Sequence, residues 1–186
     1  TSAQNISSHL SKLVNAELLS VEKQGRHKYY KIAGQDVASA VEGIANLVSK
    51  DKRRELSSHG SGAKYCRTCY DHLAGKIGVE ITEKLLSAGY IRLENKAFAV
   101  TEEGNTFFNN FGIDIPALKK MRRTFAKPCL DWSERKHHIS GSLGASLLNR
   151  MLELDWIRRT AGSRAVVITS EGRKGLFEKL KINVHE

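Results

Sequence analysis

The sequence predicts a mainly α-helical protein with small β-hairpins, divided into a short N-terminal domain and a larger C-terminal domain. Three observations predict this class. Apolar residues recur at helical spacing in several segments of the chain. Short extended runs separated by turn residues follow these segments, as expected for hairpins. An order of helix, hairpin and helix also occurs twice in the C-terminal part, which indicates an internal repeat.

The first predicted helix runs from Ser2 to Val14. Ser2 is a suitable N-cap residue, and four apolar residues form one stripe along the helix. These residues are Ile6, Leu10, Leu13 and Val14. The opposite face is polar, and its short side chains can contact base edges and phosphates. The candidate nucleic-acid contacts of this helix are Ser2, Gln4, Asn5, Ser8, His9 and Lys12.

A β-hairpin is expected directly after this helix. Ser20–Lys23 and Lys28–Ala33 would form its strands, and Gly25 supplies the permissive backbone that a tight turn needs. Three basic side chains would stand at the tip and reach a phosphate or a minor groove: Arg26, His27 and Lys28. An ordinary amphipathic helix with a hairpin fits the same spacing, so spacing alone leaves both interpretations open.

The residue order of this stretch resembles the recognition helix and wing of ArsR/SmtB-type winged-helix repressors. The resemblance rests on Asn5–Leu10, Leu13, Ala16, Leu18–Leu19 and Gly25–Tyr30. It implies a partial winged helix-turn-helix domain, because the supporting helices of such a domain would precede the recognition helix. We therefore expect native sequence before Thr1. Glu17 departs from the family pattern, which usually has glycine there.

A further helix is predicted from Gln35 to Ser49, with one apolar stripe along it. In the resembled family the helix after the wing helps to form a homodimer, so we expect dimerisation. Packing of the stripe within its own domain is the alternative. Residues 51–63 are charged and then rich in serine and glycine, which indicates a linker. The expected domains are therefore residues 1–50 and 64–186.

The C-terminal domain contains the internal repeat, with copies expected at about residues 65–113 and 131–182. The segment that begins at His72 recurs at His138, and the segment that begins at Thr101 recurs at Thr169. In each copy a long helix, Tyr65–Ala88 or His138–Leu154, would precede a hairpin and a final helix capped by threonine. Between the copies we expect a short helix, Ile115–Arg123, and an extended piece, Phe125–Leu130.

This organisation is again winged-helix-like. A subset of ArsR-type regulators carries such an extra C-terminal region, and two segments of this chain resemble the signature segments of that subset. They are Thr68–Gly75 and Cys129–Arg135, the second followed by His138 and Gly141. The resemblance thus extends over nearly the whole chain, but it does not identify an effector.

Both signature segments place cysteine, histidine and acidic residues near the start of a repeat. Cys66, Cys69 and His72 are spaced by three, so on a helix they would follow one face. Such ligands suit zinc or another borderline metal ion. The candidate residues of a metal or effector site are Cys66, Cys69, His72, Cys129, Asp131, Trp132, His137 and His138.

Three other interpretations of these residues stay open, and the cofactor is therefore undetermined. The thiols could form a redox pair or react with an electrophile. The polar residues could instead form a hydrogen-bonded core between the repeats. They could also line a pocket for a small organic or anionic effector, with Trp132 as an apolar wall.

Composition excludes several classes of protein. No apolar run is long enough to span a membrane, and no signal peptide opens the sequence. The chain has three cysteines, an odd number that argues against a disulfide framework and for a reducing cytoplasm. No P-loop, GxSxG, HExxH or dinucleotide-binding glycine pattern occurs, so we expect no enzyme. The net charge of +10 suits a polyanionic partner.

Together with the resemblance, these observations predict a cytoplasmic, homodimeric regulator of transcription that binds double-stranded DNA. We expect a repressor released by a small-molecule or metal effector, sensed in or near the C-terminal domain. The alternative is a tandem winged-helix adaptor that joins proteins without sequence-specific DNA binding.

Overall fold

The computed structural model describes residues 2–25, 27–47 and 61–184 of the chain. They belong to two compact units, Thr1–Val48 and Ser49–Glu186, which we call the N-terminal and C-terminal units. Within the described residues, no helix is long and apolar enough to cross a membrane.

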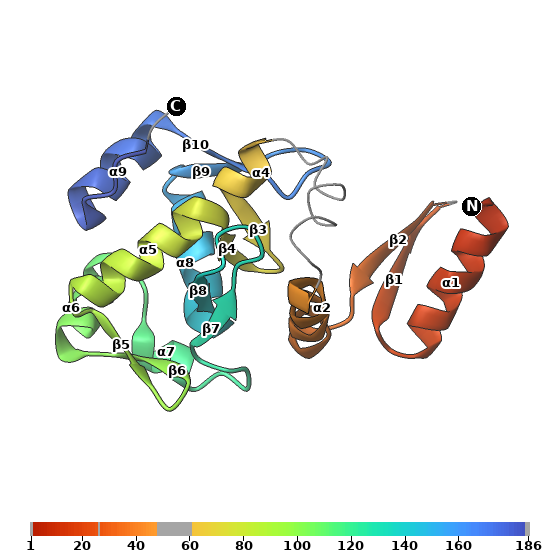
Figure 1. The fold of residues 1–186 in the computed structure, drawn as a ribbon, viewed down its shortest axis with the longest axis horizontal. Coiled ribbons are helices and arrows are strands. Elements are labelled where there is room, and N and C mark those ends of the chain that lie inside the picture. Colours follow the sequence, from red (N-terminus) through yellow and green to blue (C-terminus); the bar gives the residue numbers. More distant parts are fainter. Residues whose placement is uncertain (1, 26, 48–60, 185–186) are drawn as a thin grey trace. The chain divides into compact units, whose positions relative to one another are not determined.

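The N-terminal unit consists of a helix, a hairpin and a second helix (Figure 1). Its elements are α1 (Ala3–Asn15), β1 (Leu19–Gln24), β2 (His27–Ile32) and α2 (Gln35–Leu47). Ser2 caps α1 by accepting a hydrogen bond from the backbone N–H of Asn5 at 3.3 Å. Gly25 has a φ of +59° at the tip of the antiparallel hairpin. The predicted helix, strands and N-cap are therefore present, with boundaries shifted by one or two residues.

The C-terminal unit contains two successive sets of elements in the same order: hairpin, helix, hairpin, helix. The first set is β3 (Arg67–Cys69), β4 (His72–Ala74), α5 (Gly75–Ser87), β5 (Ile91–Glu94), β6 (Ala97–Val100) and α6 (Glu102–Asn110). The second set is β7 (Lys127–Leu130), β8 (His137–Ser140), α8 (Gly141–Glu153), β9 (Ile157–Arg159), β10 (Val166–Ile168) and α9 (Ser170–Leu180). Two short helices precede and connect them, α4 (Ser61–Tyr65) and α7 (Ile115–Lys119).

The helix predicted over Tyr65–Ala88 is wrong in its first part. The chain forms the hairpin β3–β4 after Tyr65, and α5 begins only at Gly75. Gly75 has a φ of +79°, and a Cβ atom there would lie 2.6 Å from the carbonyl oxygen of Lys64. Only glycine fits this close turn between strand and helix. Gly141 has a φ of +84° at the start of α8, so His138 lies in a strand rather than in the predicted helix.

Two other predicted segments can be compared with the structure. Most of the expected linker, residues 51–60, lies outside the described residues, and residues 61–63 form the first part of α4. The short helix between the two sets, α7, ends at Lys119 rather than at Arg123. The predicted caps of the final helices are present: Thr101 and Thr169 accept hydrogen bonds from Gly104 and Gly172, each at 2.9 Å.

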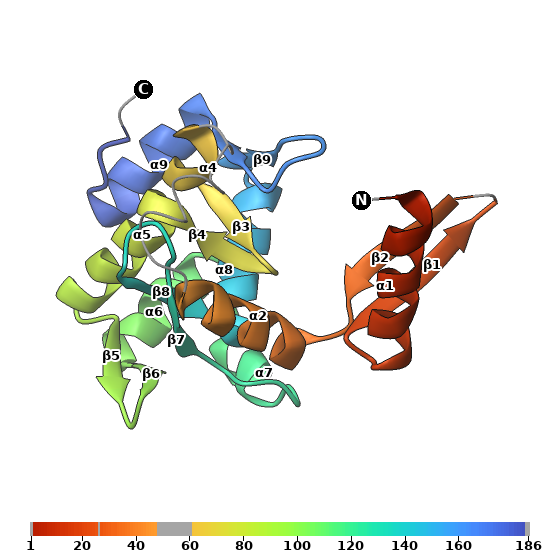
Figure 2. The same ribbon diagram turned by 45° about the vertical axis from the view of Figure 1, so that its right-hand side comes forward.

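In the C-terminal unit, elements of each set pack against elements of the other set. Helix α5 contacts β8 of the second set, α8 contacts β4 of the first set, and β4 also contacts β8. Figure 2 shows the two hairpins beside α5 and α8, near the middle of the unit. Side chains from both helices are fully buried in one core, among them Ile77, Leu85, Leu143 and Leu148. This exchange of contacts brings the first hairpin of each set to the same place.

Candidate functional site

Each of these first hairpins places one cysteine opposite one histidine. Cys69 pairs with His72 across β3 and β4, and Cys129 pairs with His138 across β7 and β8. The first pair is joined by a tight turn in which Tyr70 has a φ of +55°. The second pair is joined by a longer loop, but the strand register gives the same pairing. Each set of elements thus contributes one thiol and one imidazole.

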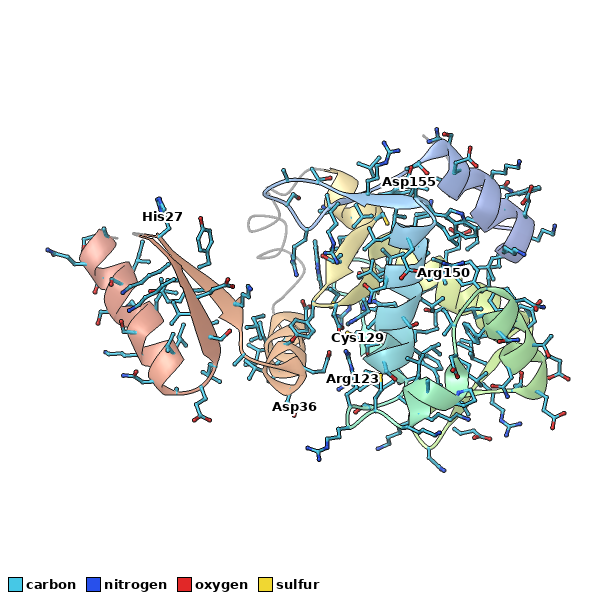
Figure 3. All side chains as sticks on the ribbon, turned by 180° about the vertical axis from the view of Figure 1, so that it is seen from behind. His27, Asp36, Arg123, Cys129, Arg150 and Asp155 are labelled. Atoms are coloured by element: carbon cyan, nitrogen blue, oxygen red, sulfur yellow. The ribbon has the colours of Figure 1, made fainter. Side chains whose placement is uncertain are left out.

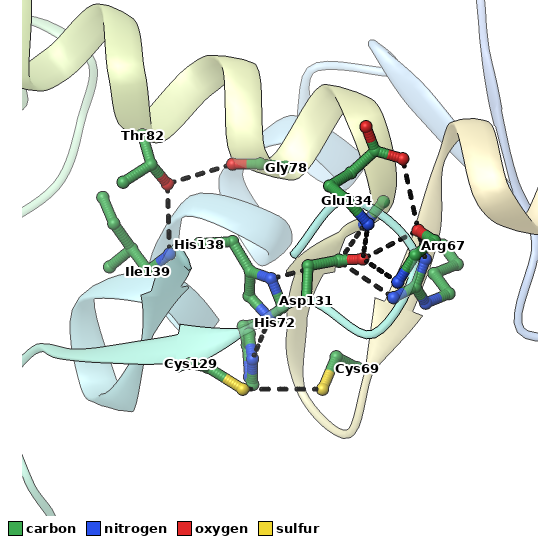
Figure 4. A network of polar contacts seen from close by, with 12 residues as sticks. Arg67, Cys69, His72, Gly78, Thr82, Cys129, Asp131, Glu134, His138 and Ile139 are labelled. Atoms are coloured by element: carbon green, nitrogen blue, oxygen red, sulfur yellow. Dashed lines mark hydrogen bonds and ion pairs between the residues drawn. The ribbon is translucent and has the colours of Figure 1, made fainter. Parts of the chain in front are cut away.

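The four side chains meet where the two hairpins face each other (Figure 4). The Nε2 atoms of His72 and His138 are 3.1 Å apart, and the Sγ atoms of Cys69 and Cys129 are 4.0 Å apart. One possible ligand atom from each of the four residues lies within 4.8 Å of all the others. Cys129 is half-buried and the other three are buried. We call these four residues the Cys/His cluster.

A carboxylate lies behind each imidazole ring of the cluster. The Nδ1 atom of His72 is 3.3 Å from Oδ1 of Asp71, whose Oδ2 accepts a hydrogen bond from Arg123 at 2.6 Å. The Nδ1 atom of His138 is 3.2 Å from Oδ2 of Asp131. Figure 3 shows Arg123 and Cys129 on the same side of the unit. Each ring therefore has its outer nitrogen against an acid and its inner nitrogen toward the cluster.

Asp131 is fully buried and holds the surroundings of the cluster in place. Its Oδ2 accepts hydrogen bonds from Arg67 at 2.8 Å and from the backbone N–H of Gly75 at 2.7 Å. Its Oδ1 accepts hydrogen bonds from the backbone N–H and the hydroxyl of Ser133. The guanidinium of Arg67, also buried, lies 4.5 Å from the ring centroid of Trp132. Because Arg67 and Asp131 come from different sets, their ion pair joins the two sets.

The surroundings shift the pKa values of these groups. Burial raises the pKa of Asp131, but the contact with His138 and the charge and hydrogen bond of Arg67 outweigh it, so the carboxyl pKa lies well below its usual range. Burial lowers the pKa of His72 and His138, but the carboxylates behind them and Cys69 raise it above the ordinary value. The hydrogen bond with Cys129 and burial raise the pKa of Cys69 to about 12. Asp131 is thus ionised while Cys69 keeps its proton at neutral pH.

The other candidates of the C-terminal domain do not belong to the cluster, although Asp131 lies directly beside it. Cys66 is fully buried in the apolar core, and burial raises its pKa to about 12. His137 is exposed, because successive residues of a strand point to opposite sides and His138 takes the inward side. Asp131 contacts a histidine of the cluster, and Trp132 covers Arg67. Arg67 was not among the predicted site residues, since arginine usually lies at the surface.

The candidate DNA contacts are displayed on the surface of the N-terminal unit. Exposed side chains on α1 include Gln4, Asn5, Ser8, His9 and Lys12, whereas Ser2 serves as the helix cap. His27 and Lys28 are exposed at the start of β2, and Figure 3 shows His27 projecting at the hairpin tip. Arg26 lies outside the described residues.

Comparison with known proteins identifies a relative along nearly the whole chain. The chain is 43% identical over 183 residues to the HTH-type transcriptional regulator YdfF of Bacillus subtilis (strain 168), an alignment that covers 97% of this chain and 81% of the relative. No family model matches the chain, and no solved structure is significantly similar to it. The extent and level of this identity establish the family: the chain belongs to the HTH-type transcriptional regulators.

Proposed function

We propose that this protein is a sequence-specific DNA-binding repressor of the ArsR/SmtB type that acts as a homodimer. The observation that carries the proposal is the surface of the N-terminal unit. A capped helix, α1, displays a polar face without any acidic residue in its first turn, and a hairpin with basic and polar residues at its tip follows directly. The family assignment supports the same function, because HTH-type regulators are named for a DNA-reading helix.

In this proposal, α1 enters the major groove and the hairpin reaches the flanking backbone or minor groove. Asn5, Ser8 and His9 contact base edges, because their short polar groups can donate and accept hydrogen bonds there. Lys12 and Lys28 contact phosphates, as do Arg26 and His27. All of these side chains that the structure describes are exposed and free of packing constraints from the core.

The dimer is supported by α2. Three apolar side chains of this helix are strongly exposed within the described residues: Val41 at 49%, Ile44 at 65% and Leu47 at 84%. A second copy of the chain would cover them and relate two α1 helices by a two-fold axis, which matches two half-sites on DNA. The effector is sensed in the C-terminal unit, where the buried polar network joins the two sets of elements.

The test measures DNA binding by the full chain. Duplexes are selected from a random-sequence pool, labelled with fluorescein, and titrated by fluorescence anisotropy at several salt concentrations. We expect tighter binding to selected than to unselected duplexes, with the logarithm of affinity falling linearly against the logarithm of salt concentration. Absence of salt-dependent duplex binding would overturn the proposal. Sedimentation of the free protein as a monomer at micromolar concentration would overturn the dimer.

A further inference from the structure

We propose that Cys69, His72, Cys129 and His138 bind a single Zn²⁺ ion in a tetrahedral site, each through one side-chain atom. The site lies in the C-terminal unit and is separate from the DNA-reading surface proposed above. Its existence does not depend on DNA binding.

The distances in the cluster match such a site. Zinc bonds of about 2.0–2.1 Å to nitrogen and about 2.3 Å to sulfur place two nitrogen ligands about 3.3 Å apart and two sulfur ligands about 3.8 Å apart in a tetrahedron. The corresponding distances are 3.1 Å between the Nε2 atoms of the two histidines and 4.0 Å between the two Sγ atoms. The distances from sulfur to nitrogen, at most 4.8 Å, would contract to about 3.6 Å around the ion.

The orientation of the two imidazole rings also suits a metal ion. Asp71 and Asp131 lie against the Nδ1 atoms, where a carboxylate favours the N–H form of that nitrogen. Both Nε2 atoms then point into the cluster 3.1 Å apart, a separation that fits either a hydrogen bond from one ring to the other or two nitrogen ligands of one metal ion. A carboxylate behind each metal-bound histidine is the usual second layer of a protein metal site.

The donor set selects the class of ion. Two sulfur and two imidazole donors suit Zn²⁺ and disfavour Mg²⁺ or Ca²⁺, which prefer oxygen ligands. Both thiols would release their protons to solvent when the ion binds. The two thiolates would then neutralise the divalent ion, so the filled site would carry no net charge into its buried surroundings. Four protein ligands leave no position for a substrate, which indicates a structural or regulatory ion rather than a catalytic one.

The ion would join the two sets of elements, because each hairpin supplies two ligands. Its binding would therefore stabilise the arrangement in which the two hairpins are packed against each other. We assign Zn²⁺ as the effector of the repressor, a step that rests on the proposed function.

The first experiment uses Co²⁺ as a spectroscopic probe of the full chain, reduced, stripped of metal and kept anaerobic. We expect an intense visible absorption of tetrahedral Co²⁺ and a sulfur-to-cobalt charge-transfer band, both saturating at one equivalent. One equivalent of Zn²⁺ should abolish both. A weak octahedral spectrum, or no spectrum, would overturn the site.

Matched variants identify the ligands. Cys69→Ser and His138→Gln are expected to lower the Co²⁺ affinity at least about 100-fold, since each removes a direct ligand and not merely an outer partner. Their controls, Cys66→Ala and His137→Gln, alter the neighbouring cysteine and histidine that lie outside the cluster and should keep the spectrum and affinity of the unaltered protein. Equal losses in variants and controls would contradict the assignment.

A measurement on the unaltered chain guards against variants that fail to fold. Mass spectrometry follows alkylation of each cysteine with and without Zn²⁺. We expect Zn²⁺ to slow the alkylation of Cys129, the half-buried cysteine, at least about tenfold because the metal-bound sulfur is no longer free to react. The same rate with and without Zn²⁺ would overturn the site.

The effector role is tested with the duplexes selected above. We expect Zn²⁺ to weaken binding to them at least about fivefold, the lower end of typical allosteric coupling. A Co²⁺ spectrum with unchanged DNA affinity would overturn the effector role and leave the site. A Co²⁺ spectrum without DNA binding in either state would overturn the proposed function and leave the site.

Discussion

His72 and His138 turn their Nε2 atoms toward each other at a distance of 3.1 Å, although they come from different hairpins. Each ring has a carboxylate on its other side, Asp71 or Asp131. The position of each imidazole is therefore set by a chain of contacts that begins outside the Cys/His cluster. Substitutions of those outer residues should therefore change the affinity of the cluster for a metal ion.

Asp71 should act as a positioning residue for His72. Asp71→Ala removes the carboxylate behind the ring, and we expect the Co²⁺ affinity to fall about 10- to 100-fold while the shape of the tetrahedral spectrum is kept. Asp71→Asn should recover part of the affinity, because its amide oxygen can still accept a hydrogen bond from Nδ1. Affinities that do not differ among the three proteins would contradict this role.

The buried ion pair between Arg67 and Asp131 should matter for folding. Asp131→Asn leaves the buried Arg67 guanidinium without a counter-charge, and we expect a loss of about 3–5 kcal/mol in the free energy of unfolding, measured by urea denaturation of the metal-free protein. The matched control is Glu83→Gln, which removes the exposed ion pair with Lys136. The control should leave the urea midpoint nearly unchanged, since exposed pairs are screened by water. A similar loss in both would argue against the buried pair as a stabilising contact.

Gly144 allows α8 to approach the first hairpin closely. A Cβ atom at this position would lie 2.3 Å from the carbonyl oxygen of Ile139 and 3.1 Å from the Cβ of His72. Gly144→Ala should destabilise the protein by about 1–3 kcal/mol, the usual cost of overpacking, and it should also weaken Co²⁺ binding by displacing His72. Gly62→Ala is the control, because nothing lies within 4 Å of its added Cβ. A lower melting temperature for Gly62→Ala than for Gly144→Ala would contradict this expectation.

Lys28 should contribute to DNA binding without discriminating between sequences. Lys28→Ala removes one phosphate contact, so we expect weaker binding to all duplexes and a salt slope reduced by about one unit. Asn5→Ala should instead reduce the difference between selected and unselected duplexes. Lys174→Ala changes the net charge equally but lies on α9 of the other unit, so it controls for charge alone. The assignment of Lys28 fails if both lysine variants shift the slope equally.

Local features of the chain could be predicted well from the sequence. The cap at Ser2, the stripe of α1 and the turn at Gly25 depend on neighbouring residues, and they appear as predicted. The hairpin β3–β4 was missed because its short strands are buried along their whole length and show no alternation of polar and apolar residues. The threefold spacing of Cys66, Cys69 and His72 therefore looked helical.

The site was predictable only as a set of residue types. Cys69, His72, Cys129 and His138 were all among the candidates, but so were Cys66 and His137. Which cysteine and which histidine point inward depends on strand positions and on the packing of the two sets against each other. Such contacts join residues far apart in the chain, and spacing carries no information about them.

The four donors of the Cys/His cluster are divided equally between the two hairpins. Neither hairpin provides more than two donors, one sulfur and one nitrogen, so the complete set of donors exists only while both halves are docked. If one half separates from the other, each hairpin retains only its own two donors. Two donors bind a metal ion far more weakly than four do. Retention of the ion would thus report that the C-terminal unit has been assembled as a whole.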